Sequence, residues 1–292
     1  MAERICTSKD TKRPNAWLNQ YARKVSSQHG EEGIIAKVLE VIGQTDKWCV
    51  EFGSWDGKNC SNTYDLIATK GYSAVLIEAS EKRFGDLVEN FRDNDRVICL
   101  NKFVGFDASD NLDAILSRTK IPNDFDVLSI DIDGNDYHVW EAVRNYKPKV
   151  VVIEFNPTIP SEVEFVQPRD LGVTQGSSIL SMTKLATTKG YELAAATRNN
   201  AIFVDSKYFD LFGIEDNSAA AIRTDESVIT HIFCGYDGTV FIRGYGRNPW
   251  HQIALRESKM QILPKWARKH AGDKNPVRRR LGRFYRRLLK EA

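Results

Sequence analysis

The 292-residue chain lacks several features that would place it in a specialised class of proteins. It has no apolar run approaching ~20 residues, the length that a membrane-spanning helix needs. Its five cysteines are scattered without a C-x-x-C pair, which argues against a zinc ribbon or a redox motif. The first 15 residues contain no apolar stretch, so we expect no secretory signal there. These absences favour a reduced, cytoplasmic protein.

The chain also lacks the G-x-G-x-x-G loop that binds the pyrophosphate of dinucleotides. Residues 48–57 instead read WCVEFGSWDG, an apolar strand followed by Glu51, Gly53 and Gly57. Trp55 and Lys58 stand where the dinucleotide loop needs its second and third glycines. Glycines at such a turn let a ligand approach the backbone closely. The loop therefore suits a nucleoside without a pyrophosphate, such as S-adenosylmethionine, and argues against a nicotinamide-dependent dehydrogenase.

The body of the chain has a net negative charge, whereas its end is strongly basic. Residues 264–292 hold eleven Lys or Arg against two acidic residues, a net charge of +9, whereas the remainder has 30 basic against 37 acidic residues. This tail also places four apolar residues on one helical stripe: Val277, Leu281, Phe284 and Leu288. Such a basic amphipathic helix can lie on an anionic membrane, bind nucleic-acid phosphates or cover the acidic body. We leave the three interpretations open, and expect a cytoplasmic protein that is peripheral to a membrane if the first holds.

Between residues 26 and 157, helix-like and strand-like segments alternate. A capped amphipathic helix is expected over 26–43, and a second helix over 60–71, ended by Gly71. Five apolar segments, each followed by polar residues, have the length and composition of buried strands: 48–52, 72–80, 96–105, 125–134 and 149–157. The alternation predicts an α/β fold with a doubly wound, mostly parallel sheet.

The rhythm changes after residue 160. Residues 161–176 are predicted to form a loop or lid, 177–190 a helix, and 191–204 a hairpin that turns at Asn199–Asn200. A second hairpin is expected over 231–244, turning at Asp237–Gly238. We therefore expect four regions: an N-terminal arm (1–25), a cofactor domain (26–205), a C-terminal extension with a hairpin (206–263) and a basic tail (264–292).

Acidic residues follow the predicted strands at the edge where open α/β sheets bind ligands. Glu78 ends the second strand, 27 residues after Glu51, and can accept hydrogen bonds from two ribose hydroxyls. Asp107 follows the third strand and suits an adenine amino group, although it can equally cap the next helix.

The fourth and fifth strands are followed by a denser group of polar residues. Asp131, Asp133, Glu154 and Asn156 form an oxygen-rich set that suits Mg²⁺ or Mn²⁺. His138 is a candidate general base, or a solvent-facing residue of the next helix. Turn formation at Asp133–Gly134 and helix capping by Asp136 are the structural alternatives.

Short motifs in this order resemble the FkbM-type class I S-adenosylmethionine-dependent methyltransferases, with their Rossmann-like fold. They lie within about residues 26–205 and include SQHGEEG (27–33), EFGSWDGKNCSNT (51–63), LIEAS (76–80), SIDIDGNDYHVW (129–140) and VVIEFNP (151–157). The resemblance implies S-adenosyl-L-methionine as cofactor, bound by Gln28, Glu51, Gly53, Ser54, Gly57, Asn62, Glu78, Ala79, Asp107 and Asp131. For Gln28, helix capping is the alternative.

The same resemblance implies O-methylation of a hydroxyl on a natural product or sugar, and a saccharide or glycan acceptor is our first expectation. Deprotonating that hydroxyl requires a general base or a metal acting as Lewis acid. The candidate catalytic residues are Asp133, His138 and Glu154, and the candidate metal ligands are Asp131, Asp133, Glu154 and Asn156. An RNA 2′-O-methyltransferase, favoured by the basic tail, and a non-catalytic cofactor-binding module are the alternatives. Against RNA, residues 26–205 show no basic groove interleaved with aromatics.

Overall fold

The structure, a computed structural model, describes residues 13–270 and 275–288. Its main element is a seven-stranded sheet with the order β3-β2-β1-β4-β5-β7-β6. Strands β1 to β5 are parallel, and β7 is antiparallel to both of its neighbours. The strands are β1 (Trp48–Phe52), β2 (Ser73–Glu78), β3 (Val97–Asn101), β4 (Val127–Ile130), β5 (Val150–Glu154), β6 (Tyr191–Ala196) and β7 (Asn200–Asp205). The doubly wound, mostly parallel α/β fold expected from the sequence is confirmed.

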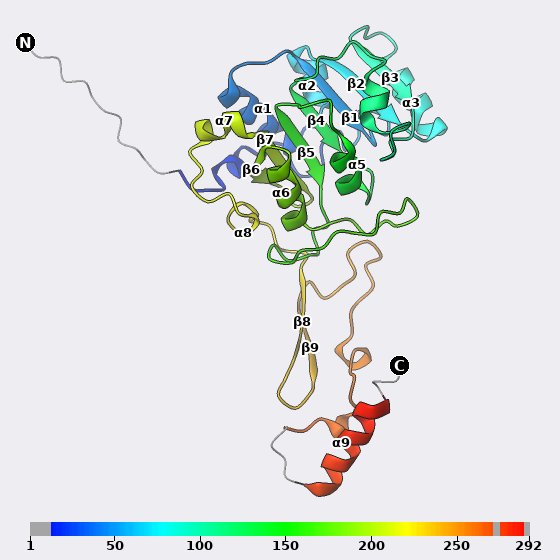
Figure 1. Ribbon diagram of the computed structural model, residues 1–292, viewed down its shortest axis with the longest axis vertical. Coiled ribbons are helices and arrows are strands. Elements are labelled where there is room, and N and C mark those ends of the chain that lie inside the picture. The colour runs from blue at the N-terminus through cyan, green and yellow to red at the C-terminus, as the bar shows by residue number, and fades with distance from the viewer. Residues whose placement is uncertain (1–12, 271–274, 289–292) are drawn as a thin grey trace, which may run out of the picture. The chain divides into compact units, whose positions relative to one another are not determined.

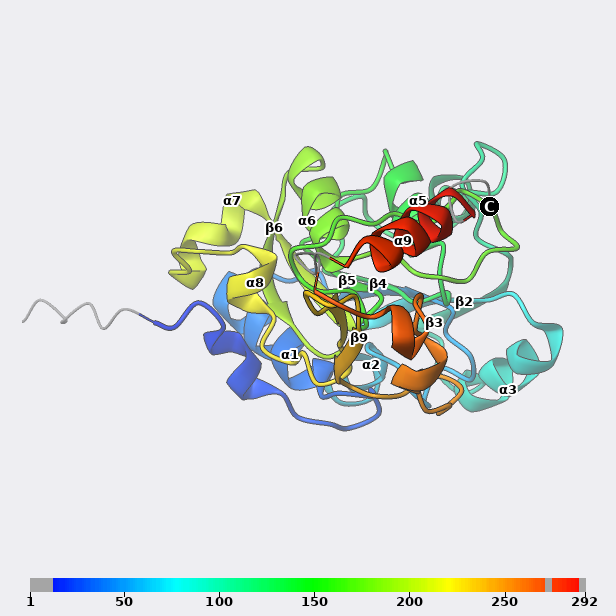
Figure 2. The same cartoon turned by 90° about the horizontal axis from the view of Figure 1, so that it is seen from below.

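Helices cover both faces of this sheet. Figures 1 and 2 show α1 and α2 on one face and α5 and α6 on the other. Helix α3 packs at the β3 edge, and α7 and α8 pack beside β6. The bounds are η1 (Trp17–Tyr21, a 3-10 helix), α1 (Glu31–Ile42), α2 (Tyr64–Lys70), α3 (Glu81–Phe91), α4 (Leu112–Leu116), α5 (Asp136–Ala142), α6 (Ile179–Thr188), α7 (Ser206–Phe209), η2 (Asp210–Phe212) and α8 (Ala219–Ile222).

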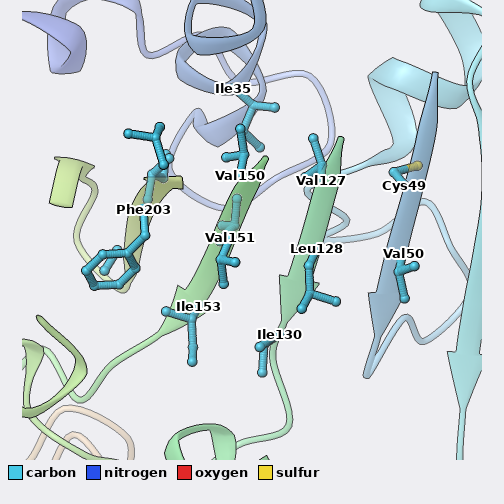
Figure 3. Packing of buried hydrophobic residues seen from close by; sticks show 14 of the residues in the cluster. Ile35, Cys49, Val50, Val127, Leu128, Ile130, Val150, Val151, Ile153 and Phe203 are labelled. Atoms are coloured by element: carbon cyan, nitrogen blue, oxygen red, sulfur yellow. The ribbon is translucent and has the colours of Figure 1, made fainter. Parts of the chain in front are cut away.

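The hydrophobic core lies between the sheet and these helices. Each central strand is buried on both faces, which explains why its sequence is a continuous apolar run rather than an alternating one. Figure 3 shows the side chains of adjacent strands lying next to one another, with Ile35 of α1 above them. The labelled strand residues are Cys49, Val50, Val127, Leu128, Ile130, Val150, Val151, Ile153 and Phe203.

Strand order and register together define one edge of the sheet as the place for a site. From β1 the chain moves outward to β2 and β3, then returns to the other side of β1 to form β4 and β5. Phe52, the last residue of β1, pairs with Ile77 on one side and Ile130 on the other. The residues that follow are Gly53, Glu78 and Asp131, so they meet at the switch point where ligands bind in open α/β sheets.

Two helices begin later than their sequence pattern predicts. Residues 26–30 form a loop because the Glu32 carboxylate accepts hydrogen bonds from the backbone N–H groups of Ser26 (2.5 Å) and Ser27 (2.6 Å). Helix α2 begins at Tyr64 rather than at Cys60, because residues 61–63 are bonded to the carboxylate of Glu51. In both places, a buried carboxylate accepts hydrogen bonds from the residues just before the helix. These bonds hold those residues in a loop instead of a further helical turn.

The described part of the predicted N-terminal arm, residues 13–25, is integrated into the sheet unit. Trp17 and Leu18 are buried in the main core, and the indole N–H of Trp17 donates to the carbonyl of Phe212 at 3.0 Å. Asn19 donates to the carbonyl of Ile222 at 3.1 Å. The segment was predicted to be an arm because its composition is mostly polar, but its two apolar residues, Trp17 and Leu18, anchor it to the core. Residues 1–12 of the predicted arm lie outside the described residues.

The chain divides between Glu226 and Ser227 into two compact units. Residues 206–226, expected in the C-terminal extension, therefore belong with the sheet. The second unit contains the hairpin β8 (Thr230–Cys234) and β9 (Val240–Gly244), the 3-10 helices η3 (Glu257–Lys259) and η4 (Lys265–Ala267), and α9 (Pro276–Leu288). The hairpin expected around Asp237–Gly238 is confirmed. Within the described ranges, we find no helix with the length and apolar character to span a bilayer.

We predict that Trp17→Ala lowers the free energy of unfolding of the sheet unit by about 3–5 kcal/mol, because it removes a buried aromatic side chain and leaves a cavity. Urea denaturation followed by circular dichroism measures this change. The matched control is Leu211→Ala, which truncates an exposed side chain next to Phe212 and should cost less than about 1 kcal/mol. Equal stability of the Trp17 variant and the wild-type protein would mean that this segment is a dispensable arm.

Candidate functional site

A cavity of about 380 Å³ lies at the carboxyl ends of β1, β2 and β4. Eight of the residues predicted to form the site line it: Gln28, Glu51, Gly53, Ser54, Glu78, Ala79, Asp131 and Asp133. A larger and more open hollow, about 720 Å³, is lined by Gly43, Thr45 and Lys47 before β1 and by Tyr72 before β2. That hollow holds none of the predicted site residues, so the smaller cavity is the candidate site.

Gly53 makes the turn at the end of β1 possible. Its φ is +71°, in the left-handed region, and a Cβ atom placed on it would lie 1.7 Å from the carbonyl oxygen of Asp131. The next residue, Ser54, donates from both its backbone N–H (3.2 Å) and its hydroxyl (3.0 Å) to the carbonyl of Ile77. The loop therefore leaves β1 in close contact with β4 and bonded to β2.

Gly57 has a different role in the same loop. A Cβ atom there would lie 2.4 Å from Phe91 and 2.7 Å from Leu87, both on α3. Gly57 does not line the cavity but allows α3 to pack against the loop. Of the two glycines, Gly53 is therefore required by the turn at the cavity, and Gly57 by the packing of α3.

Glu51 lines the cavity, but its carboxylate is engaged by the chain itself. It accepts hydrogen bonds from the hydroxyls of Ser61 (2.5 Å) and Thr63 (2.8 Å), from the backbone N–H of Asn62 (2.8 Å) and from Ser129 (3.3 Å). Burial raises the pKa of Glu51. The side chain of Asn62 donates to Ser129 at 3.1 Å and does not line the cavity. Glu51 and Asn62 therefore attach residues 61–63 to β1 and β4.

Glu78 occupies the tip of β2 in a fixed orientation. One carboxylate oxygen accepts from the backbone N–H of Trp55 at 2.9 Å, and the other accepts from that of Ser80 at 2.7 Å. The side chain is buried, and the carboxylate retains further acceptor positions toward the cavity that it lines. A rigid carboxylate of this kind can accept two neighbouring hydroxyls of a ribose.

The third strand contributes other residues than the one predicted. Asp107 is exposed and does not line the cavity; its carbonyl accepts from the backbone N–H groups of Asp110 and Asn111. The cap of α4 is Asn111, whose side chain accepts from Ala114 at 2.9 Å. Because β3 ends at Asn101, the residues that reach the cavity are Lys102, Phe103 and Val104.

Asp131, Asp133 and Glu154 come together beyond the ends of β4 and β5, with one carboxylate oxygen from each lying within 4.8 Å of the others. Burial, reinforced by the charges of Asp136 and Asp133, raises the pKa of Asp131 well above its ordinary value. Burial and the charge of Asp131 do the same to the pKa of Glu154. Among the described ion pairs, none involves these three residues, so a cation would relieve their repulsion.

Asp136, the first residue of α5, closes the turn that carries this cluster. Its carboxylate accepts from the backbone N–H groups of Ile132 and Gly134, both at 2.9 Å. Burial raises the pKa of Asp136 to about 6, although these two hydrogen bonds oppose the shift. Asp133 within the turn has a φ of +57°, so the turn chemistry considered for Asp133–Gly134 coexists with the position of Asp133 at the cavity.

Two of the predicted site residues are held by the loop that follows β5. The Nε2 atom of His138 lies 2.9 Å from the carbonyl of Gln167, and its ring is buried outside the cavity lining. Asn156 accepts from the backbone N–H (2.9 Å) and the hydroxyl (2.7 Å) of Thr158, and donates to the carbonyl of Gln175 at 2.7 Å. Both residues therefore help to position the 161–176 loop: His138 through the carbonyl of Gln167, and Asn156 through the carbonyl of Gln175.

The cavity also has lining residues that the sequence did not point to. The guanidinium of Arg83 lies 4.8 Å from the centre of the Trp55 ring, and both residues line the cavity with Phe103. Leu171 and Thr174 reach it from the 161–176 loop, which Asn135 holds through hydrogen bonds to the carbonyls of Asp170 (3.1 Å) and Val173 (3.2 Å). The GSW motif could have indicated Trp55, whereas Leu171 has no local signal.

No protein-family model matches the chain, and no curated protein matches it either. Among solved structures, the N-terminal domain of EvdMO1 with SAH (S-adenosylhomocysteine) bound is similar over 60% of this chain and 80% of that chain, at 12% identity and a TM-score of 0.42. TrmK of M. capricolum in complex with S-adenosylhomocysteine matches 57% of this chain and 66% of that chain, at 10% identity and a TM-score of 0.35. A putative sarcosine dimethylglycine methyltransferase from Galdieria sulphuraria matches 54% and 59%, at 16% identity and a TM-score of 0.36. Likenesses this distant carry no argument about activity.

We predict that Gly53→Ala lowers the free energy of unfolding by roughly 2–5 kcal/mol, from the left-handed backbone and the overlap with the Asp131 carbonyl. Gly43→Ala is the matched control, because Gly43 has nearly the same φ (+73°) but no atom within 4 Å of its added Cβ. The control should cost only the backbone strain of about 1–2 kcal/mol. Equal losses in the two variants, measured by urea denaturation, would show that the contact between β1 and β4 is not tight.

Proposed function

We propose that this protein is an S-adenosylmethionine-dependent methyltransferase. The observation that carries the proposal is the arrangement at the switch point of the sheet. There, a glycine turn after β1 and the rigid Glu78 carboxylate after β2 line one cavity. Crevices at the carboxyl ends of the strands of open α/β sheets bind nucleotides in this position, with a carboxylate on the ribose. A volume of about 380 Å³ lies at the small end of ligand pockets and suits a nucleoside better than a dinucleotide.

The reaction that we propose is methyl transfer to a hydroxyl, with a saccharide as the expected acceptor class. Bound S-adenosylmethionine would supply an electrophilic methyl group, with its sulfur keeping the electron pair of the broken bond, and a protein carboxylate would take the proton of the acceptor hydroxyl. Asp133 is the best-placed base because it is exposed and lines the cavity. Glu154 lies beside it, and burial raises its pKa, which favours uptake of a proton. His138, bonded to Gln167 outside the cavity, is assigned no proton transfer.

The predicted cofactor site is tested by isothermal titration with S-adenosylhomocysteine. We expect binding to the wild-type protein and affinity about 10- to 100-fold lower in Glu78→Gln, which corresponds to losing hydrogen bonds to a charged group. Glu81→Gln, which neutralises an exposed carboxylate at the start of α3, is the control and should bind like the wild type. Tight NADH binding without any response to S-adenosylhomocysteine would overturn the proposal. Binding without turnover on any hydroxylated acceptor would instead favour a non-catalytic module.

As the alternative to a carboxylate base, we propose that Asp131, Asp133 and Glu154 hold a divalent cation. Three oxygen ligands within 4.8 Å of one another fit Mg²⁺ or Mn²⁺, and such an ion acts as a Lewis acid when bound. Asn156, whose amide is committed to Thr158 and Gln175, is a weaker candidate ligand than the three carboxylates. Burial and the negative charges of neighbouring carboxylates raise the pKa values of Asp131 and Glu154. A bound cation would oppose the repulsion between these carboxylates.

Metal binding predicts a thermal shift. Manganese at about 100 times its dissociation constant should stabilise the wild-type protein by about 2.7 kcal/mol, because it binds only the folded state. Asp133→Asn should abolish this shift while preserving the turn, since asparagine tolerates a left-handed backbone. Asp107→Asn, an exposed position outside the cavity, should keep the full shift. An equal shift in Asp133→Asn and the wild type, or none in the wild type, would refute the metal site.

A further inference from the structure

The second unit, residues 227–292, exposes far more apolar surface than a small water-soluble unit requires. Among the residues that the structure describes, eleven of its large apolar side chains are exposed, against nine in the first unit, which is more than three times as long. Tyr236 at the hairpin tip is 92% exposed and Trp250 is 65% exposed. The buried apolar side chains of this unit, among the described residues, are those of Ile229, Val240 and Ile242. Exposed apolar residues at this density mark an interaction surface.

The same unit carries strong positive charge. It holds 15 basic and 4 acidic residues, a net charge of +11, whereas the first unit holds 26 basic and 35 acidic residues, a net charge of −9. Asp237 and Glu257 are already bonded within the unit, to Thr239 and Arg243 respectively. The unit therefore combines exposed apolar side chains with charge that attracts an anionic partner.

Helix α9 separates these two properties onto different faces. Four apolar residues fall within about 60° of one another on a helix of 3.6 residues per turn: Val277, Leu281, Phe284 and Leu288. Val277 (64%) and Phe284 (60%) are exposed. Exposed arginines lie on the flank of this stripe (Arg280 and Arg287) and farther round on the polar side (Arg279 and Arg283). A strongly amphipathic helix with a basic polar face and low overall hydrophobicity is the type that lies in a membrane interface.

The hairpin adds a second apolar element. In β8, the neighbouring residues Ile232 (54%) and Phe233 (49%) point to opposite faces, and both are exposed. The β9 edge is covered, because Gln261 bonds the backbone N–H and carbonyl of Val240, and Glu257 bonds the backbone N–H of Ile242. The hairpin thus presents exposed apolar side chains from β8 and its tip, while its β9 edge is satisfied internally.

We propose that the second unit docks on an anionic lipid bilayer, through the apolar stripe of α9 and the exposed side chains of the hairpin and of residues 250–266. Apolar side chains enter the acyl boundary, tryptophan and tyrosine lie at the headgroup level, and arginines contact lipid phosphates. Six of the eleven exposed apolar residues are aliphatic: Ile232, Ile253, Met260, Ile262, Val277 and Leu281. Aliphatic side chains gain free energy in hydrocarbon but offer no stacking surface to nucleic-acid bases, so a bilayer fits better than RNA.

The test is co-sedimentation of the full-length protein with vesicles of phosphatidylcholine containing about 30% phosphatidylglycerol, at about 50 mM salt. The triple variant Arg279→Gln, Arg280→Gln, Arg283→Gln should bind about 100-fold more weakly, at about 1 kcal/mol per arginine. Its control is Lys82→Gln, Arg92→Gln, Arg118→Gln, which removes the same charge from exposed positions of the first unit and should bind like the wild type. Phe284→Ser should weaken binding about tenfold or more, whereas Leu211→Ser, exposed in the first unit, should have no effect.

Three outcomes would overturn this proposal. The first is an absence of vesicle binding by the wild-type protein at low salt. The second is equal weakening in the two triple variants, which would mean unspecific attraction of charge. The third is that a uridine oligomer, and not vesicles, is bound in a manner that depends on the three arginines, which would assign the unit to nucleic acid. If wild-type protein binds no vesicles and Phe284→Ser lowers the melting temperature, α9 packs on the protein's own acidic surface instead.

Discussion

The close approach of Gly53 to the carbonyl of Asp131 is the constraint on which the site depends. It brings the end of β1 against the end of β4, where the order of the strands reverses. The loop after β1 then reaches β2 through Ser54, and the Glu78 carboxylate receives the Trp55 N–H. Three strand ends are thereby fixed relative to one another by contacts of the loop backbone and of the Ser54 and Glu78 side chains. Side chains placed on such ends keep their geometry without ligand, which lowers the entropic cost of binding.

The carboxylates near the cavity divide into two groups by what they contact. Glu51 and Asp136 are saturated by hydroxyls and backbone N–H groups of their own loops, so they maintain the shape of the site. Asp131, Asp133 and Glu154 receive no such donors in the described hydrogen bonds and face one another. Residues of the first group tolerate burial because they are hydrogen-bonded, whereas those of the second retain an electrostatic cost that a bound ligand would offset.

The fold and the part of the cavity that follows β1 and β2 were predictable from the sequence, because buried parallel strands leave continuous apolar runs and their carboxyl ends converge at one edge. Glu51, Gly53 and Glu78 follow from that rule and line the cavity. Asp107 was placed at the cavity because sequence distance does not reveal where β3 ends. The burial of Trp17 and the contribution of Leu171 arise from long-range packing, which leaves no periodic signal in a short polar segment or a loop.

The carboxylate cluster distinguishes between the two sides of the proposed reaction. The sulfonium reactant carries a positive charge at sulfur, and this charge is absent from the thioether left after the methyl group has departed. Negative charge beside the cavity attracts the first and has little effect on the second. The residues that resist ionisation in the empty site would therefore retain the reactive cofactor and loosen their hold once its methyl group is gone. Product release is the slow step of many enzymes. The carboxylates that are electrostatically unfavourable in the empty site would therefore also speed release of the thioether product after each turnover.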